Sequence, residues 1–87
     1  RDDKNVIFKE MALFKVVGNS IKINKALNAC KNYNPVILDQ TKKSAVIQIT
    51  ALRREVDKMA KNLKSHGLIS VSRTGAVAMT RGAEIFN

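Results

Sequence analysis

The chain has 87 residues, with 16 lysines and arginines against 7 acidic residues, which gives a formal net charge of +9 at pH 7. This length fits one domain and argues against a multi-domain enzyme. A hydrophobic fraction of 45% is typical of a folded chain, so the charge predicts a small folded domain that binds an anionic partner.

The rest of the composition argues against several other classes of protein. The single cysteine, Cys30, can form neither an intramolecular disulfide nor a thiolate-rich metal site, and it indicates an intracellular, cytoplasmic protein. Apolar runs such as Val36–Leu38 are much shorter than the roughly 20 residues of a membrane-spanning helix. We therefore expect no membrane partner, no metal and no cofactor.

The first element spans residues 4–17. Its apolar side chains fall at helical spacing, at Ile7, Met11 and Phe14. The spacing predicts a helix, although Val6–Phe8 and the segment from Phe14 onward also fit strands. This apolar stripe either completes the core or pairs with a second copy, and we favour a homodimer formed through it.

A second helix follows the break at Gly18. Asn19-Ser20 supplies N-cap residue types, and Ile23, Leu27 and Cys30 then share one face of a helix that ends near residues 32–34. Pro35 ends this segment because it disfavours the helical conformation in the residue before it.

Residues 36–49 fit two structures. The runs Val36–Leu38 and Ala45–Ile49 could pair as a hairpin across residues 40–44, or Thr41–Ile47 could form a short helix. We favour the short helix because of the element that follows it.

The strongest periodic signal in the chain lies in residues 50–66. Leu52, Val56, Met59 and Leu63 recur at intervals of four, three and four residues, which predicts a helix with Thr50 as its N-cap. We expect this helix to end at Gly67, because glycine readily adopts the left-handed conformation that follows many helices.

The C-terminal segment alternates between apolar and polar residues with a period close to two. Leu68–Arg73 and Ala76–Met79 predict two short strands joined by a turn at Thr74-Gly75. Thr80 is a suitable N-cap for a terminal helical turn that reaches Phe86.

Together, the pattern Leu63-x-x-x-Gly67-Leu68-Ile69, the short hairpin and Met79-Thr80-x-x-Gly82 resemble the winged helix-turn-helix superfamily, in the style of MarR-like small regulators. The similarity covers about residues 42–86. It implies an α+β, mainly helical fold with a C-terminal two-stranded wing. It also implies a single domain over residues 1–87, with N-terminal helices in 1–35, a helix-turn-helix in 41–66, a wing in 68–80 and a terminal helical turn in 81–87.

The outward face of helix 50–66 is mainly cationic, and arginine and lysine can donate hydrogen bonds to guanine edges or to phosphates. The resemblance implies that Arg54 and Lys58 contact bases, that Asp57 accepts from cytosine, and that Arg73 enters the minor groove. The full set of expected DNA-binding residues is Lys42, Lys43, Ser44, Thr50, Arg53, Arg54, Asp57, Lys58, Lys61, Lys64, Arg73 and Thr74. A solvated helix face and an ordinary hairpin tip remain alternatives for these charges.

No spacing in the sequence assembles a nucleophile, base and acid, a phosphate-binding glycine loop or a pair of carboxylates, so we expect no enzyme activity. The first hypothesis is a sequence-specific protein that binds double-stranded DNA, most simply a cytoplasmic, nucleoid-associated transcriptional regulator. A plasmid or phage replication or partition protein is an alternative, as are a protein-interaction winged helix and an RNA-binding protein.

The distribution of charge agrees with the first hypothesis. Residues 42–81 hold nine of the 16 basic residues against two acids, Glu55 and Asp57. The N-terminal 41 residues hold seven bases and four acids, so we expect that part to be the scaffold and the subunit contact.

Overall fold

A computed structural model describes residues 6–80 of the chain, and side chains within residues 7–75. The elements follow the order β-α-β-β-α-β, with two short 3₁₀ turns. They are β1 (Val6–Val17), α1 (Ser20–Ala29), η1 (Lys31–Tyr33), β2 (Val36–Gln40), β3 (Ser44–Ala51), α2 (Arg53–Leu63), η2 (Lys64–His66) and β4 (Leu68–Thr80).

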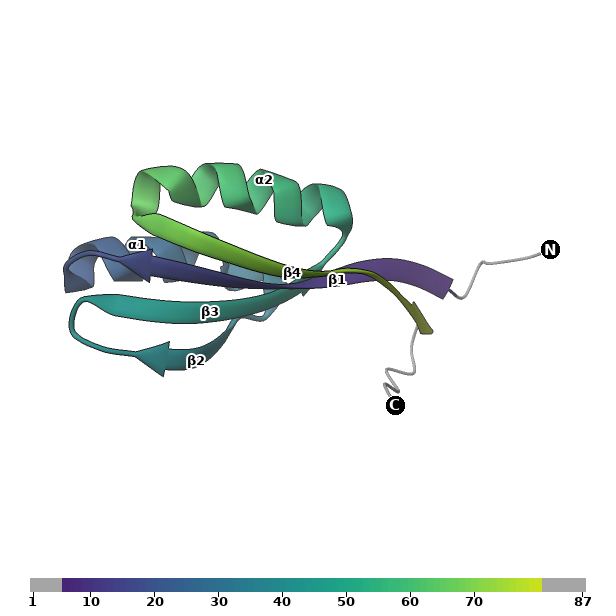
Figure 1. Cartoon of the computed structure of the whole chain (residues 1–87), viewed down its shortest axis with the longest axis horizontal. Helices are drawn as coiled ribbons and strands as arrows, with labels where there is room; N and C mark the ends of the chain where they lie inside the picture. Colours follow the sequence, from purple (N-terminus) through teal and green to yellow (C-terminus); the bar gives the residue numbers. More distant parts are fainter. Residues whose placement is uncertain (1–5, 81–87) are drawn as a thin grey trace.

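The four strands form one antiparallel sheet in the order β2-β3-β1-β4 (Figure 1). Both helices pack on the same face of this sheet. The element order and strand order are those of a ferredoxin-like fold. The predicted mainly helical winged helix-turn-helix is therefore wrong. The segments predicted as helices over residues 4–17 and 41–47 lie mainly in strands, and β4 passes through the predicted turn at Thr74-Gly75.

Strand β1 replaces the helix predicted for residues 4–17. Alternate side chains of β1, including Ala12, Phe14 and Val16, are fully buried under the helices. Phe14 and Met11, which the helical interpretation placed on one stripe, point to opposite faces of the sheet because strand side chains alternate. The strand alternative for part of this segment was correct, and the N-terminal helix proposed as a dimer contact does not exist.

Strands β2 and β3 form a hairpin, which was the alternative interpretation of residues 36–49. The predicted short helix over Thr41–Ile47 is therefore wrong. Ile37 pairs with Ile47, and the burial of β3 alternates strictly along its eight residues. The β-branched residues Val46, Ile47, Ile49 and Thr50 favour such a pleated, half-buried surface.

Strand β4 runs unbroken through the predicted wing turn. Between the pairs Glu10↔Ala76 and Ala12↔Arg73, β4 contains one more residue than β1, which defines a β-bulge. Gly75 has a φ of +80°, and the Thr74 hydroxyl accepts the Met11 N–H at 3.0 Å in place of a backbone carbonyl. The same glycine that predicts a turn instead accommodates the bulge, and no wing forms.

The far halves of β1 and β4 extend past the rest of the sheet. Val6–Lys9 pairs with Val77–Thr80, whereas the pairing of β1 with β3 stops at Glu10↔Ala51. The result is a two-stranded ribbon that projects from the body, toward the right in Figure 1. The terminal helical turn predicted for residues 81–87 lies outside the described residues.

The two helices are close to their predicted positions. Asn19 caps α1, with its side-chain Oδ1 accepting the Lys22 N–H at 2.9 Å. Helix α2 begins at Arg53 with Leu52 as N-cap rather than Thr50, which belongs to β3. Gly67 adopts the left-handed conformation after η2, as predicted.

One hydrophobic core lies between the sheet and the helices. Its largest fully buried side chains include Phe14, Ile23, Ile47, Ile49 and Leu63. Cys30 belongs to this core, as its place on the apolar face of α1 predicted. Among the described residues, no helix is long and apolar enough to cross a membrane.

Candidate functional site

The face of the sheet opposite the helices is not covered by any described element. Its rows follow from the strand register, in which Val36, Gln48, Leu13 and Ser72 lie side by side across the four strands. The next row contains Val46, Lys15 and Ser70. Met11 and Val17 extend the apolar part of this face along β1. We call this surface the open sheet face.

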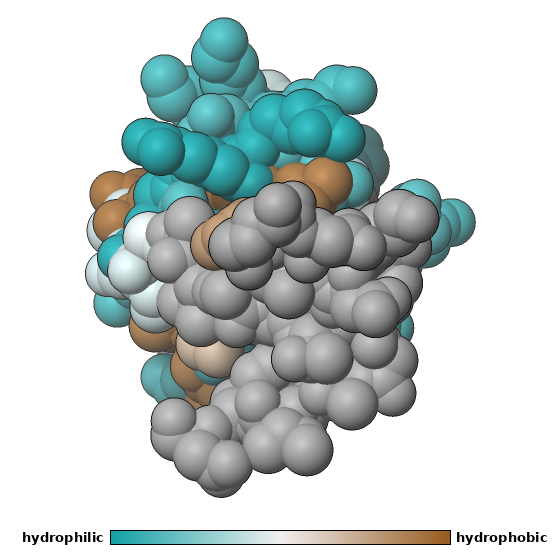
Figure 2. Space-filling model, turned by 90° about the vertical axis from the view of Figure 1, so that its right-hand side faces the viewer, coloured by the Kyte–Doolittle hydropathy of each residue, from teal (hydrophilic) through white to brown (hydrophobic). Residues whose placement is uncertain are grey.

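The opposite side of the molecule, formed by α1, η1, α2 and η2, is strongly cationic. Figure 2 shows hydrophilic residues gathered over α2, which lies at the top in both views. We call this surface the helical side. Its eight basic side chains are all exposed, and they are Lys22, Lys25, Lys31, Arg53, Arg54, Lys58, Lys61 and Lys64.

Only two acids, Glu55 and Asp57, lie in the described helices, and both are engaged within the chain. Glu55 Oε1 accepts the Leu52 N–H at 2.9 Å and caps the start of α2. Asp57 Oδ1 accepts from a terminal nitrogen of Arg73 at 2.6 Å. The carboxylates that could offset the lysines on this side are therefore already hydrogen-bonded.

Arg73 links three elements through its two acidic partners. Its Nε donates to Glu10, a carboxylate on β1 that is 2% exposed, while its terminal nitrogen donates to Asp57 on α2. These hydrogen bonds raise the pKa of Arg73, the bond to Glu10 contributing most. Arg73 and Asp57 are therefore a structural pair that joins β4 to α2, and neither has the free outward position expected of a base-reading residue.

Two hollows lie in the groove between the helices. One, of about 340 Å³, is lined by Ile21, Lys22 and Lys25 of α1 together with Ser65 and His66 after α2. The other, of about 250 Å³, is lined by the end of α1, the turn η1 and by Glu55, Lys58, Met59 and Asn62 of α2. Exposed lysines thus line both hollows.

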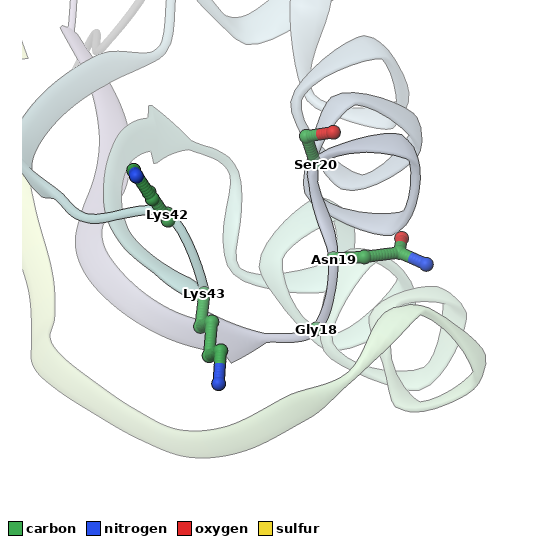
Figure 3. A pocket seen from close by; sticks show the side chains of 5 residues that line it. All are labelled: Gly18, Asn19, Ser20, Lys42 and Lys43. Carbon is green, nitrogen blue, oxygen red and sulfur yellow. The ribbon is translucent and has the colours of Figure 1, made fainter.

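A third hollow, of about 440 Å³, lies where β1 enters α1 and is lined by Gly18, Asn19, Ser20, Lys42 and Lys43. The Gly18 N–H donates to the Lys43 carbonyl at 2.9 Å and fixes the β2–β3 turn against this entry. Figure 3 shows that the side chains of Lys42 and Lys43 point in different directions and do not converge on Asn19. This arrangement does not enclose a ligand.

The structure separates the residues predicted to bind DNA into four regions. Lys42 and Lys43 belong to the β2–β3 turn, and Ser44 follows as the first residue of β3, with its hydroxyl 2.8 Å from that of Thr41. Thr50 lies on the open sheet face, and Thr74 fills the bulge of β4. The remaining cations stay together on the helical side, namely Arg53, Arg54, Lys58, Lys61 and Lys64.

The prediction missed the contribution of α1 to this cationic surface. Lys22 and Lys25 alternate with the buried residues Ile23 and Ala26, so they point outward from the core. The helical pattern of α1 was already visible in the sequence and could have placed them. Their proximity to α2 could not be predicted, because it depends on the sheet that brings the helices together.

The described residues contain no group of three or more histidines, cysteines or acids that could hold a metal ion. Cys30 is buried, and burial raises the pKa of its thiol to about 11. A neutral, inaccessible thiol is a weak nucleophile and a poor metal ligand.

Comparisons with known proteins give one consistent result. The family described as "Small subunit of acetolactate synthase" matches residues 9–82. The acetolactate synthase small subunit of Bacillus subtilis (strain 168) is 24% identical over 82 residues, which are 94% of this chain and 48% of that protein. The crystal structure of the acetolactate synthase small subunit from Thermotoga maritima superposes with a TM-score of 0.74 at 30% identity, over 92% of this chain and 49% of that one.

The chain thus spans about half the length of the relatives that it matches. The family match and the shared fold overturn the resemblance to winged helix-turn-helix regulators. Three predictions depended on that resemblance and are therefore wrong. They are the role as a transcriptional regulator, double-stranded DNA as the partner and association with the nucleoid.

Proposed function

The chain belongs to the family of acetolactate synthase small subunits, and on that premise we propose that it is a non-catalytic part of such a subunit that binds the large subunit of the synthase. The observation that supports this proposal most strongly is the extent of the match. Residues 9–82 include both helices and nearly the whole sheet, so the match covers the folded unit rather than a single motif.

The chemistry of the described residues agrees with a role in binding. Glu10, Glu55 and Asp57 are engaged in hydrogen bonds that hold the fold together, and the Cys30 thiol is buried. General acid-base and nucleophilic catalysis need accessible groups in contact with each other and with a substrate. We propose that the chain changes the activity of its partner rather than catalysing a reaction itself.

The surfaces of the molecule also fit contact with other protein chains. The open sheet face presents apolar side chains from three strands, and the helical side presents cations around Ile21. Exposed apolar patches with polar neighbours are typical of protein interfaces. A single core formed by residues from β1 to α2 supports the further proposal that residues 1–87 fold as one domain.

The test combines binding with activity. The full chain is mixed with the purified large subunit of acetolactate synthase from the same source, and the mass of the complex is measured by size-exclusion chromatography with light scattering. Acetolactate formation by the large subunit is then measured with and without the chain. We expect a complex of both chains and a changed rate. Separate elution together with an unchanged rate would show that the proposed function is wrong.

A further inference from the structure

We propose that the helical side binds an acidic surface of the large subunit, with Lys22, Lys25 and Lys58 at the contact and Ile21 as its apolar anchor. This inference rests on the proposed function, because it assigns a surface and a partner chemistry to the binding proposed there. It goes beyond the proposed function because it names the helical side, and not the open sheet face, as the principal contact with the large subunit.

The first observation is the lack of intramolecular compensation for the charge. Eight exposed cations lie on the helical side, and its two carboxylates, Glu55 and Asp57, are bound to the start of α2 and to Arg73. Like charges gathered on one surface repel each other, and a partner of opposite charge relieves that repulsion. The part of the chain that the structure describes therefore leaves this surface complementary to an acidic one.

The second observation is the position of the lysines in the groove between the helices. Lys22 and Lys25 line the hollow beside Ser65 and His66, and Lys58 lines the hollow beside Tyr33. A cation at the edge of a hollow can bond a partner carboxylate while the hollow receives an adjoining side chain. The groove can therefore bind a partner both by charge, through its lysines, and by shape, through hollows that receive a side chain.

The third observation favours a protein over a nucleic acid as the partner. Ile21 is 65% exposed and lines the same hollow as Lys22 and Lys25. An aliphatic side chain gains free energy when it packs against apolar atoms, which a phosphate backbone does not offer. An acidic protein surface offers both carboxylates for the lysines and apolar side chains for Ile21.

The open sheet face lacks this chemistry. Only two cations of the described strands, Lys9 and Lys15, alternate onto this face along β1. Lys9 lies on the projecting ribbon, and the row of Lys15 contains Val46, Ser70 and the acidic Asp39. Binding through that face would depend on apolar contact and would change little with salt. Binding through the helical side would weaken as salt screens the charges, because the Debye length falls from about 10 Å at 0.1 M to about 3 Å at 1 M.

The experiment compares two variants of the full chain that lose the same number of charges. In the first, Lys22→Gln, Lys25→Gln and Lys58→Gln are combined. In the matched control, Lys15→Gln, Lys42→Gln and Lys43→Gln are combined, which removes exposed lysines of the sheet and of its turn. All six side chains are exposed, so both variants are expected to fold, and circular dichroism and thermal melting are used to check this. Affinity for the large subunit is measured at about 0.05 M and 0.5 M salt.

We expect the helical-side variant to bind at least about tenfold more weakly than the unaltered chain at low salt, and the control to lose less than about threefold. Ile21→Ser alone is expected to weaken binding several-fold at both salt concentrations, since it removes apolar contact rather than charge. Salt should weaken the unaltered chain far more than the helical-side variant.

The outcomes separate this inference from the proposed function. If the unaltered chain does not bind the large subunit, the proposed function fails. If the unaltered chain binds but the helical-side variant binds equally well, or the control is the weaker of the two, the inference alone is wrong. Equal affinity for random-sequence duplex DNA under the same conditions would also overturn it, because the surface would then recognise negative charge without recognising a protein.

Discussion

The carboxylate of Glu10 in β1 accepts a hydrogen bond from Arg73 Nε in β4, although the register pairs Arg73 with Ala12 rather than with Glu10. The bulge at Thr74-Gly75 adds one residue to β4 between these positions. The guanidinium of Arg73 lies on the helical side of the sheet, where its other end bonds Asp57 of α2. One side chain therefore connects the edge strand β4 and its neighbour β1 to the second helix.

Removing Arg73 should destabilise the fold substantially. Arg73→Met leaves the buried Glu10 carboxylate without its cation, and we expect the free energy of unfolding to fall by about 2–3 kcal/mol. Urea-induced unfolding followed by circular dichroism measures this change.

Asp57→Asn is the matched control for this pair. Asp57 is exposed, so its ion pair with Arg73 should contribute less than about 1 kcal/mol. Equal losses for Arg73→Met and Asp57→Asn would contradict the assignment of Glu10 as the principal partner. The double variant Glu10→Met with Arg73→Met should recover stability relative to Arg73→Met, because it removes the unpaired buried charge.

Gly67 should tolerate no side chain. Its φ is +83°, and a Cβ added there would lie 2.0 Å from the Val17 carbonyl oxygen. The Gly67 carbonyl also accepts the Val17 N–H at 2.9 Å, so neither segment can move away without losing this bond. We expect Gly67→Ala to lower the free energy of unfolding by more than about 2 kcal/mol.

Gly75→Ala provides the comparison. Gly75 has a similar φ of +80°, but a Cβ built there meets nothing within 4 Å. The cost should therefore be restricted to backbone strain, about 1 kcal/mol. If thermal melting shows equal losses for the two variants, steric contact with Val17 is not the reason that position 67 needs glycine.

The N-cap of α1 should make a smaller, local contribution. Asn19→Ala removes the acceptor of the Lys22 N–H, and we expect a loss of about 1 kcal/mol in unfolding free energy. Asn19→Asp should retain the bond and most of the stability. Amide hydrogen exchange at Lys22 checks the local effect, since protection there should fall in Asn19→Ala and persist in Asn19→Asp.

Burial of Cys30 should make the stability depend on alkaline pH. The folded thiol has a pKa of about 11, raised from 9.0 by desolvation, so the folded state holds its proton where the unfolded state has lost it. Stability from this group is complete below pH 9 and declines as the pH rises through about 11, by about 2–3 kcal/mol. The decline in unfolding free energy should be steeper in the unaltered chain than in Cys30→Ala, and parallel curves would contradict this account.

The sequence predicted the helices better than the strands, for a physical reason. From its N-cap Leu52 through α2, large apolar residues recur at 56, 59 and 63, and the other helix residues except Ala60 are polar or charged, so a single period explains the helix. Strand β1 lies in the centre of the sheet, and apolar residues on both of its faces also satisfy a helical spacing. Which period applies depends on pairing with β3 and β4, and that pairing is not local.

The candidate site was partly predictable for a similar reason. The cations of α2 could be placed on its outer face from periodicity alone. The engagement of Asp57 by Arg73 could not be predicted, because it depends on a bulge whose glycine also fits a hairpin turn. That ambiguity produced the predicted wing, which was one of the three features on which the resemblance to a DNA-binding fold rested.

The most direct test of the account is a paired affinity measurement. The full chain is titrated, at about 0.15 M salt, against the large subunit of acetolactate synthase and against random-sequence duplex DNA. We expect the chain to bind the large subunit with a Kd of about 1 μM or below and to bind DNA at least about tenfold more weakly. Tight binding to DNA without measurable binding to the large subunit would contradict it.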